Sequence, residues 1–402
     1  MIFDAMAPVP RPAHVPPELE YDFDFLAPPG AKEDVQLAWK RLHDEAPDIF
    51  WTPRNGGHWV ATRGEDIREV QTNWRRYSQR VMTIPASLQT FRILPANIDP
   101  PEHEQYRRII LPAFLPREVE KLDADIRALA RELIAEIAPH GTCEFIEDFA
   151  RKLPIIAFLK VVQLPLEDRE MLVELAKTIM HGTDRDKANV AQGQMTAYVA
   201  HWIEERRARP GNDLISWIVH ATIGERPINE EETFGLVRLV LFGGLDTLTS
   251  LMGFIWRFLA THPEHCRELI REPGLRRTAV DELIRRHGVV NTARQITEDC
   301  TWKGVKFRAG EMIQIPNALV GLDERITPDP LKVDFRRPHV EHAAFGSGPH
   351  HCPGAILARR EIAASLDAWL DLIPEFGLAP GTEPVLHSGA SNNGILRLEL
   401  AW

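Results

Sequence analysis

The sequence predicts a mainly α-helical, α+β fold that forms one domain over residues 1–402. Helical periodicity dominates from about residue 102 to 288, a second helical pattern follows Cys352 as far as about Ile373, and the strand-like segments are short. The chain has 402 residues, of which 44% are hydrophobic, so it can bury one large core.

The first 30 residues are rich in proline and acidic side chains. They lack the basic start and apolar stretch of a signal peptide, so we expect an extended arm that lies on the surface. After this arm, His58-Trp-Val-Ala-Thr62 alternates as a strand does, and a helical pattern runs from Gly64 to near Tyr77.

The long helical region begins at Asp99-Pro-Pro-Glu102, since prolines are tolerated in the first turn of a helix. Clusters of proline and glycine divide it into separate helices. Residues 236–260 are apolar enough to resemble a membrane span, but they carry Arg238, Asp246 and Arg257. Because charges inside a membrane are costly, this segment is predicted to be a long buried helix, and no membrane association is expected.

The last third of the chain contains the predicted strands. Residues 302–307 and 311–315 flank Arg308-Ala-Gly310, a pattern that predicts a hairpin with a glycine in its turn. The chain is irregular from Asp323 to Pro349, and residues 395–400 are predicted to form a final strand.

Charge and cysteine content exclude several classes of protein. The formal net charge of −11 argues against non-specific binding of nucleic acids. The 4 cysteines are scattered without a CxxC pair, which indicates neither a disulfide framework nor a zinc ribbon and fits a reducing cytoplasm.

The most informative segment is Phe345-Gly-Ser-Gly-Pro-His-His-Cys352-Pro-Gly354, which leads directly into a helix. A helix N-terminus stabilises a thiolate, and a thiolate can bind iron. The glycines let backbone N–H groups approach the sulfur, and Phe345 can shield it from water. Taken alone, a cysteine before a helix is more often a packed core residue than an iron ligand.

Three upstream segments also carry reactive groups. Leu241-Phe-Gly-Gly-Leu-Asp-Thr247 places two glycines within a core helix, at a cost of about 1 kcal/mol each. Here Asp246 could relay protons, and Thr247 could hydrogen-bond to the carbonyl four residues earlier and open the helix. A helix contact through small residues is the alternative. Each of the other two segments places two side chains on one helix face: Glu282 with Arg285, and His103 with Arg107. The alternative is that these faces are solvated and the pairs have no function.

Together these segments follow the order HxxxR, GGxDT, ExxR, FGxGxHxC, and the chain resembles a bacterial class I cytochrome P450 over nearly its whole length. Strings shared with the camphor 5-monooxygenase family make that family the most similar. These strings are Gly-Gly-Leu-Asp-Thr at 243–247, Gly321-Leu-Asp-Glu-Arg325, Val333-Asp-Phe335 and Leu357-Ala-Arg-Arg-Glu-Ile362.

The resemblance implies a P450 fold with minor antiparallel sheets, a single haem domain and haem b as cofactor. Cys352 would be the thiolate ligand of the iron. Asp246 and Thr247 match the acid–alcohol pair that delivers protons to dioxygen. The remaining matches are the propionate and haem contacts His103, Arg107, Arg294, His350 and Phe345, and the structural ion-pair network of Glu282, Arg285 and Arg337.

The implied activity is that of a monooxygenase that hydroxylates a small apolar cyclic substrate, a terpenoid or norisoprenoid, with O2. No flavin or iron–sulfur segment is apparent, so we expect electrons from a [2Fe–2S] ferredoxin served by an NADH-dependent reductase, and we expect a cytoplasmic monomer. An acidic ferredoxin would require a local basic patch, for which the candidates are Arg76, Arg107, Arg108 and Arg359.

The substrate pocket departs from the camphor-hydroxylating pattern. Its candidate residues are Phe91, Leu239, Phe242, Gly243 and Val290. Phe91 stands where those enzymes hold a ketone with a tyrosine hydroxyl, and Ala390-Ser391-Asn392 stands where apolar pocket residues are expected. Two alternative classes are a haem-thiolate sensor without turnover, and a metallohydrolase using histidines of the irregular segment, which lack HExxH spacing.

Overall fold

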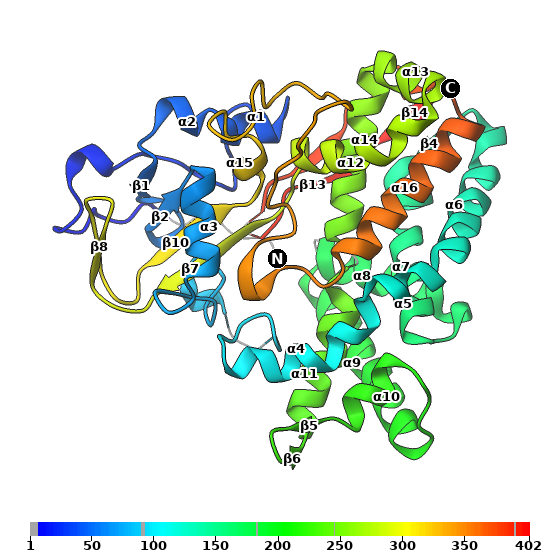
Figure 1. Ribbon diagram of the computed structural model, residues 1–402, viewed down its shortest axis with the longest axis horizontal. Coiled ribbons are helices and arrows are strands. Elements are labelled where there is room, and N and C mark those ends of the chain that lie inside the picture. Colours follow the sequence, from blue (N-terminus) through cyan, green and yellow to red (C-terminus); the bar gives the residue numbers. More distant parts are fainter. Residues whose placement is uncertain (1–6, 90–92, 182–183, 245, 390) are drawn as a thin grey trace.

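The computed structural model describes residues 7–89, 93–181, 184–244, 246–389 and 391–402. Strands and short helices from the N-terminal third and from around residue 300 form one region, and long helices form the other (Figure 1). The helix-rich α+β fold expected from the sequence is confirmed. Among the described residues, no helix has both the length and the apolarity needed to cross a membrane.

The helices follow the proline- and glycine-marked divisions of the sequence. They are α1 (Val35–Lys40), α2 (Leu42–Glu45), α3 (Gly64–Thr72), α4 (Glu102–Ile110), α5 (Pro116–Lys121), α6 (Asp123–Ile137), α7 (Lys152–Val162), α8 (Arg169–His181), α9 (Arg185–Ala208), α10 (Leu214–Val219), α11 (Glu230–Phe242), α12 (Thr247–Thr261), α13 (Pro263–Arg271), α14 (Arg276–Arg286), α15 (Ala318–Gly321) and α16 (Ala355–Leu372).

The largest sheet has the strand order β1-β2-β10-β7-β3, with β10 parallel to β2 and the other pairs antiparallel. The smaller sheets, all antiparallel, are β11-β14-β4, β12-β13, β5-β6 and β8-β9. The strands are β1 (Ile49–Thr52), β2 (His58–Ala61), β3 (Tyr77–Ser78), β4 (Thr142–Glu144), β5 (Thr222–Ile223), β6 (Arg226–Pro227), β7 (Asn291–Ile296), β8 (Cys300–Trp302), β9 (Val305–Phe307), β10 (Met312–Pro316), β11 (Gly377–Leu378), β12 (Val385–His387), β13 (Gly394–Arg397) and β14 (Glu399–Ala401).

The N-terminal segment is irregular, as its prolines predict, but it does not lie wholly on the surface. Val15, Phe23 and Phe25 are buried in the core. The expectation of a surface arm was wrong here because these apolar side chains find partners in β1 and its surroundings, such as the ring of Phe50, 6.2 Å from that of Phe23.

Two strand predictions were also wrong. The hairpin forms around Lys303 and Gly304, whose φ angles are 49° and 81°, so that β9 pairs with β8. The strand predicted to be its partner, β10, lies instead between β2 and β7. The single final strand predicted at 395–400 is divided at Leu398 into β13 and β14, which belong to different sheets.

The long helix predicted over 236–260 is interrupted. It ends at Phe242 as α11 and resumes at Thr247 as α12. No hydrogen bond joins the Thr247 hydroxyl to the carbonyl of Gly243 in the described structure, so the threonine does not open the helix in the expected way. The two glycines, which are poor helix formers, mark the break instead.

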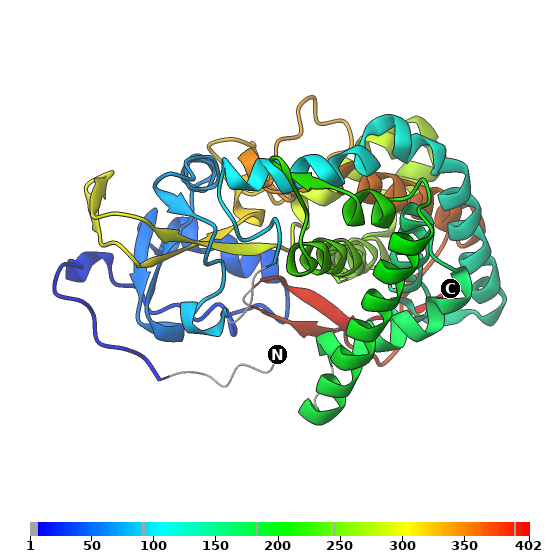
Figure 2. The same ribbon diagram turned by 90° about the horizontal axis from the view of Figure 1, so that it is seen from below.

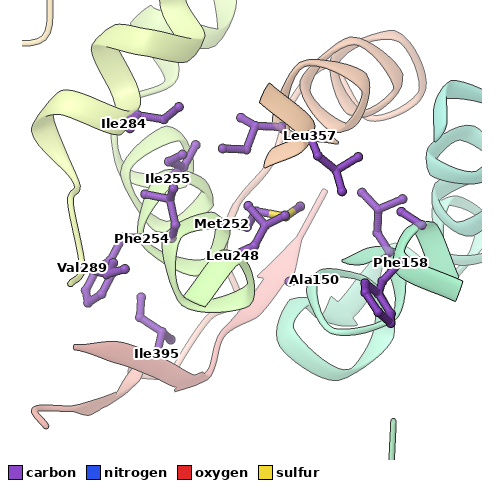
Figure 3. Packing of buried hydrophobic residues seen from close by; sticks show 14 of the residues in the cluster. Ala150, Phe158, Leu248, Met252, Phe254, Ile255, Ile284, Val289, Leu357 and Ile395 are labelled. Atoms are coloured by element: carbon purple, nitrogen blue, oxygen red, sulfur yellow. The ribbon is translucent and has the colours of Figure 1, made fainter. Parts of the chain in front are cut away.

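The core fixes α12 against α16, the helix that follows Cys352. In Figure 3, Leu248 and Met252 of α12 lie toward Leu357 of α16. Deeper in the core, the Trp256 ring of α12 lies 5.8 Å from the Trp369 ring of α16, edge to face. This packing holds the helix break and the cysteine loop in a fixed relation.

One buried carboxyl lies on α16. The Oε2 atom of Glu361 is buried and has no hydrogen-bond partner among the described residues. Burial raises the pKa of this carboxyl to about 8. The folded protein therefore keeps a proton that an unfolded chain, with a glutamate pKa of about 4.3, releases. The resulting stabilisation is complete below about pH 4 and is lost as the pH rises through the folded-state pKa.

We expect Glu361→Gln to stabilise the protein increasingly above pH 5, because glutamine needs no proton to remain neutral. The gain in the free energy of unfolding over the native chain should grow by about 1.4 kcal/mol per pH unit up to about pH 8. Urea denaturation at several pH values measures it. Glu375→Gln, at an exposed carboxylate, is the control. Parallel pH curves for the native and Glu361→Gln chains would contradict the prediction.

Candidate functional site

The loop that carries Cys352 is shaped by glycines in the left-handed region. Gly346 and Gly348 have φ angles of 71° and 69°. A Cβ on Gly348 would lie 3.0 Å from the carbonyl oxygen of Gln71 in α3, so the loop packs there because this position has no side chain. The Cys352 amide donates to the Phe345 carbonyl at 2.9 Å and closes the loop just before α16.

Positive groups surround the Cys352 sulfur. Burial raises the pKa of the thiol, while the N–H groups of Gly354 and Ala355 and the guanidinium groups of Arg107 and Arg359 act to lower it. The two N–H groups belong to the start of α16, whose dipole favours an anion. These groups would stabilise the thiolate, which is the form that binds iron.

A cluster of basic side chains lies beside this loop. The rings of His103 and His350 are 4.4 Å apart, and their Nδ1 and Nε2 atoms, respectively, are buried without a hydrogen-bond partner among the described residues. Burial and neighbouring positive charges lower the pKa of His103 to about 4 and of His350 to about 2. Burial also lowers the pKa of Arg294 to about 10.

Asp99 acts on His103 and Arg294 as a negative charge, whereas the groups that act on His350 are all basic. The neighbours that lower the pKa of His350 are His103, Arg294 and Arg107, which are cations or become cations on protonation. Two carboxylates placed here would satisfy the orphaned nitrogen atoms and offset the cost of the buried charge. The propionates of haem b are such a pair, so the residues present fit that group.

The break between α11 and α12 leaves backbone open in the interior of the fold. Gly243 and Gly244 are exposed, although residues of α11 and α12 on either side are buried. Asp246 and Thr247, which follow, are half-buried. An exposed, side-chain-free stretch between two core helices is what a flat ligand lying against the backbone requires.

The sequence did not reveal the partner of Asp246. The Asn392 Nδ2 atom donates to the Asp246 Oδ2 atom at 2.9 Å, between residues 146 positions apart. The signal in the sequence was that Ser391 and Asn392 are polar where apolar residues were expected. Residue 390 lies outside the described residues.

The predicted pocket residues are described in part. Leu239 on α11 and Val290 ahead of β7 are half-buried. Val290 forms an isolated β-bridge with Asn392. Phe91 lies outside the described residues, as does the side chain of Phe242.

The structure brings Glu282, Arg285 and Arg337 together. Arg285 binds both carboxylate oxygens of Glu282 at 2.8 Å, and neither side chain is exposed. Arg337 adds a contact to the same carboxylate at 3.2 Å. Arg285 also donates to the carbonyl oxygens of Gly321 and Pro330 at 2.7 Å, so it ties the irregular segment to α14.

The arginines predicted to dock a partner differ in their contacts. Arg108 is 78% exposed and lies 3.7 Å from Glu104. Arg76 is half-buried. Arg107 donates to the carbonyl of His351, and Arg359 binds Asp281 at 2.7 Å, so these two serve the cysteine loop and its surroundings.

Comparisons with known proteins agree with this arrangement. The cytochrome P450 family model matches residues 275–383. "Probable cytochrome P450 127A1" of Sinorhizobium fredii is 34% identical over 403 residues, covering 98% of this chain and 97% of that protein. "Mycinamicin IV hydroxylase/epoxidase" of Micromonospora griseorubida is 31% identical over 355 residues, 86% of this chain and 89% of that protein.

A solved structure gives the same result for the fold. Cytochrome P450 CYP101C1, of the camphor type, superposes with a TM-score of 0.89 at 36% identity, covering 98% of this chain and 99% of that one. The family resemblance expected from the sequence is therefore confirmed. This chain belongs to the cytochrome P450 family and is a monooxygenase that binds haem b.

Proposed function

We propose that this P450 hydroxylates a small, apolar, cyclic substrate of the terpenoid or norisoprenoid class, using O2 and electrons from a [2Fe–2S] ferredoxin. The observation that carries the proposal is the pair Asp246-Thr247 at the break between α11 and α12, beside the exposed Gly243 and Gly244. Similarity to CYP101C1 and to a hydroxylase supports the same type of reaction.

Haem bound through Cys352 would supply the activation of dioxygen, which electron donation from a thiolate favours. The protein's own residues prepare the site for it. Arg107, Arg294, His103 and His350 would hold the propionates, because they are basic and because the Nδ1 atom of His103 and the Nε2 atom of His350 are buried without a described hydrogen-bond partner. Asp246 would relay protons together with the hydroxyl of Thr247, the residue that follows it in the chain.

The substrate class follows from the lining of the pocket. Leu239 and Val290 offer apolar, partly exposed side chains, and the phenylalanine at position 91 cannot donate a hydrogen bond. A substrate held mainly by apolar contact is consistent with these residues. A terpenoid or norisoprenoid has the apolar surface that such contacts require.

Positive charge near the cysteine loop supports a ferredoxin as the electron donor. Arg108 extends from α4 with its side chain 78% exposed, and its neighbour Arg107 contacts the cysteine loop. A cationic site beside the cysteine loop attracts an acidic ferredoxin in spite of the net charge of −11.

A titration tests the substrate class. We expect terpenoids or norisoprenoids to convert the haem from low to high spin, seen as a Soret shift, and to be hydroxylated when NADH, the reductase and the ferredoxin are added. Fatty acids and planar aromatic compounds are the controls. A response to these controls and to no terpenoid would overturn the assignment. Binding without product would favour a sensor.

A further inference from the structure

We infer that Asn392 is a positioning residue that holds the carboxylate of Asp246 for proton transfer. This inference rests on the proposed function of Asp246. The Asn392 Nδ2 atom donates to Asp246 Oδ2 at 2.9 Å and lies 3.4 Å from the Ser250 hydroxyl oxygen, one helical turn further along α12. One amide group therefore bridges the break and the first turn of α12.

The backbone holds Asn392 firmly in place. On one side of it, the backbone carbonyl of Ser391 accepts a hydrogen bond from the backbone N–H of Asn291 at 2.8 Å. On the other side, the backbone N–H of Asn393 donates to the carbonyl of Val289 at 2.9 Å. These bonds fasten the segment to the start of β7. The side-chain amide of Asn392 therefore extends from a segment whose backbone is hydrogen-bonded on both sides.

The same segment lies close to α12. A Cβ on Gly394 would be 2.7 Å from the Ser250 hydroxyl oxygen, so the backbone approaches the helix as closely as a glycine allows. Figure 2 shows the strands near the C-terminus, coloured red, beside the central helix that is seen nearly end-on. This proximity fixes the distance between Asn392 and Asp246.

The conformation of Asp246 indicates what Asn392 changes. Asp246 occupies the N-cap position of α12, where an aspartate usually accepts hydrogen bonds from the first N–H groups of its helix. Its side chain makes no such capping bond. The amide of Asn392 binds the carboxylate instead. A hydrogen bond to an ionised group is strong enough to select this alternative orientation.

The consequence concerns proton delivery. A carboxylate that caps its own helix is bound by N–H groups and is turned toward the backbone. Held by Asn392, it is not bound by the first N–H groups of α12, and Thr247 is the next residue in the chain. Loss of the amide donor should therefore slow the proton-dependent step and leave substrate binding unchanged.

The test compares Asn392→Leu, Asn392→Asp and Asp246→Asn in the haem-loaded protein with a terpenoid that gives the spin shift. We expect Asn392→Leu to lower kcat roughly 10-fold, to raise the solvent isotope effect and to divert electrons to hydrogen peroxide. The KM and the spin-shift Kd should change less than about 2-fold. Adding Asn392→Leu to Asp246→Asn should cause no further loss, because the amide acts through the carboxylate.

Asn392→Asp gives a second readout. At neutral pH the introduced carboxylate repels Asp246, and at lower pH its protonated form can donate as the amide does. We expect its activity to rise relative to the native enzyme as the pH falls. The matched control is Asn393→Leu, since the Asn393 Oδ1 atom is buried and has no described partner. This control should leave the isotope effect and the pH profile unchanged.

Four outcomes would overturn the inference. A raised KM and Kd with unchanged kcat for Asn392→Leu would make Asn392 a substrate contact. Equal losses of thermal stability in Asn392→Leu and Asn393→Leu, with an unchanged isotope effect, would make its role purely structural. If Asp246→Asn kept native coupling, the proposed role of Asp246 itself would fail. If kcat fell in Asp246→Asn but not in Asn392→Leu, the inference about Asn392 would be wrong and the proposed role of Asp246 would stand.

Discussion

Replacing Cys352 with serine is expected to abolish the thiolate-type Soret band of the reduced, carbon monoxide-treated protein. Arg107, Arg359 and the N-terminus of α16 would still favour an anion, but a serine hydroxyl is far less acidic than a thiol and cannot supply the same ligand. Hydroxylation should fall by more than the roughly 100-fold that loss of an outer-shell partner of a metal ligand costs.

Cys300→Ser is the matched control, since Cys300 lies on β8 and is only partly buried. It should leave both the spectrum and the rate unchanged. A thiolate-type band that persisted in Cys352→Ser would assign the ligand to another cysteine and would contradict the prediction. Haem content, measured separately, distinguishes loss of the ligand from loss of the cofactor.

Replacing Arg285 with methionine is expected to destabilise the protein by about 3–5 kcal/mol. Glu282 and Arg285 have no exposed side-chain surface, so the change leaves a buried carboxylate with only Arg337 as its cationic partner. It also removes the hydrogen bonds to the carbonyl oxygens of Gly321 and Pro330. Urea denaturation followed by circular dichroism measures the loss.

The control for this prediction is Arg397→Met, which breaks a pair whose arginine is 63% exposed. Exposed pairs contribute about 1 kcal/mol or less, so this change should be close to neutral. If the two arginine variants lost the same stability, the buried network would not brace the fold. The Glu282→Gln/Arg285→Met double variant should be more stable than Arg285→Met alone, because the buried charge is gone.

The parts of the site that could be predicted are those that the chain builds locally. The loop before α16 depends on Gly346 and Gly348 and on the helical pattern that follows, all within a short stretch of sequence. The interruption between α11 and α12 follows from two adjacent glycines. The i, i+3 spacing of Glu282 and Arg285 places them on one helix face whatever surrounds them.

The features that sequence reasoning missed depend on distant partners. Both Gly304 and Gly310 have positive φ angles and could close a hairpin. The choice is made by β10, which pairs with β7 and with β2, a strand far from it in sequence. Burial of Phe25 likewise depends on a core that composition cannot locate. The bond from Asn392 to Asp246 joins two segments whose proximity only the complete fold creates.

The order of strands in the largest sheet has a consequence for synthesis on the ribosome. β2 ends at Ala61, and its second neighbour, β10, is complete only at Pro316. At about 5–20 residues per second, translation leaves roughly 10–50 s between the two strands. During that time one edge of β2 has its backbone N–H and C=O groups unpaired, and such an edge can pair with another chain. A nascent chain paused before residue 312 therefore exposes an unpaired, aggregation-prone edge of β2. We expect chaperones that bind extended segments to bind the nascent chain at this strand.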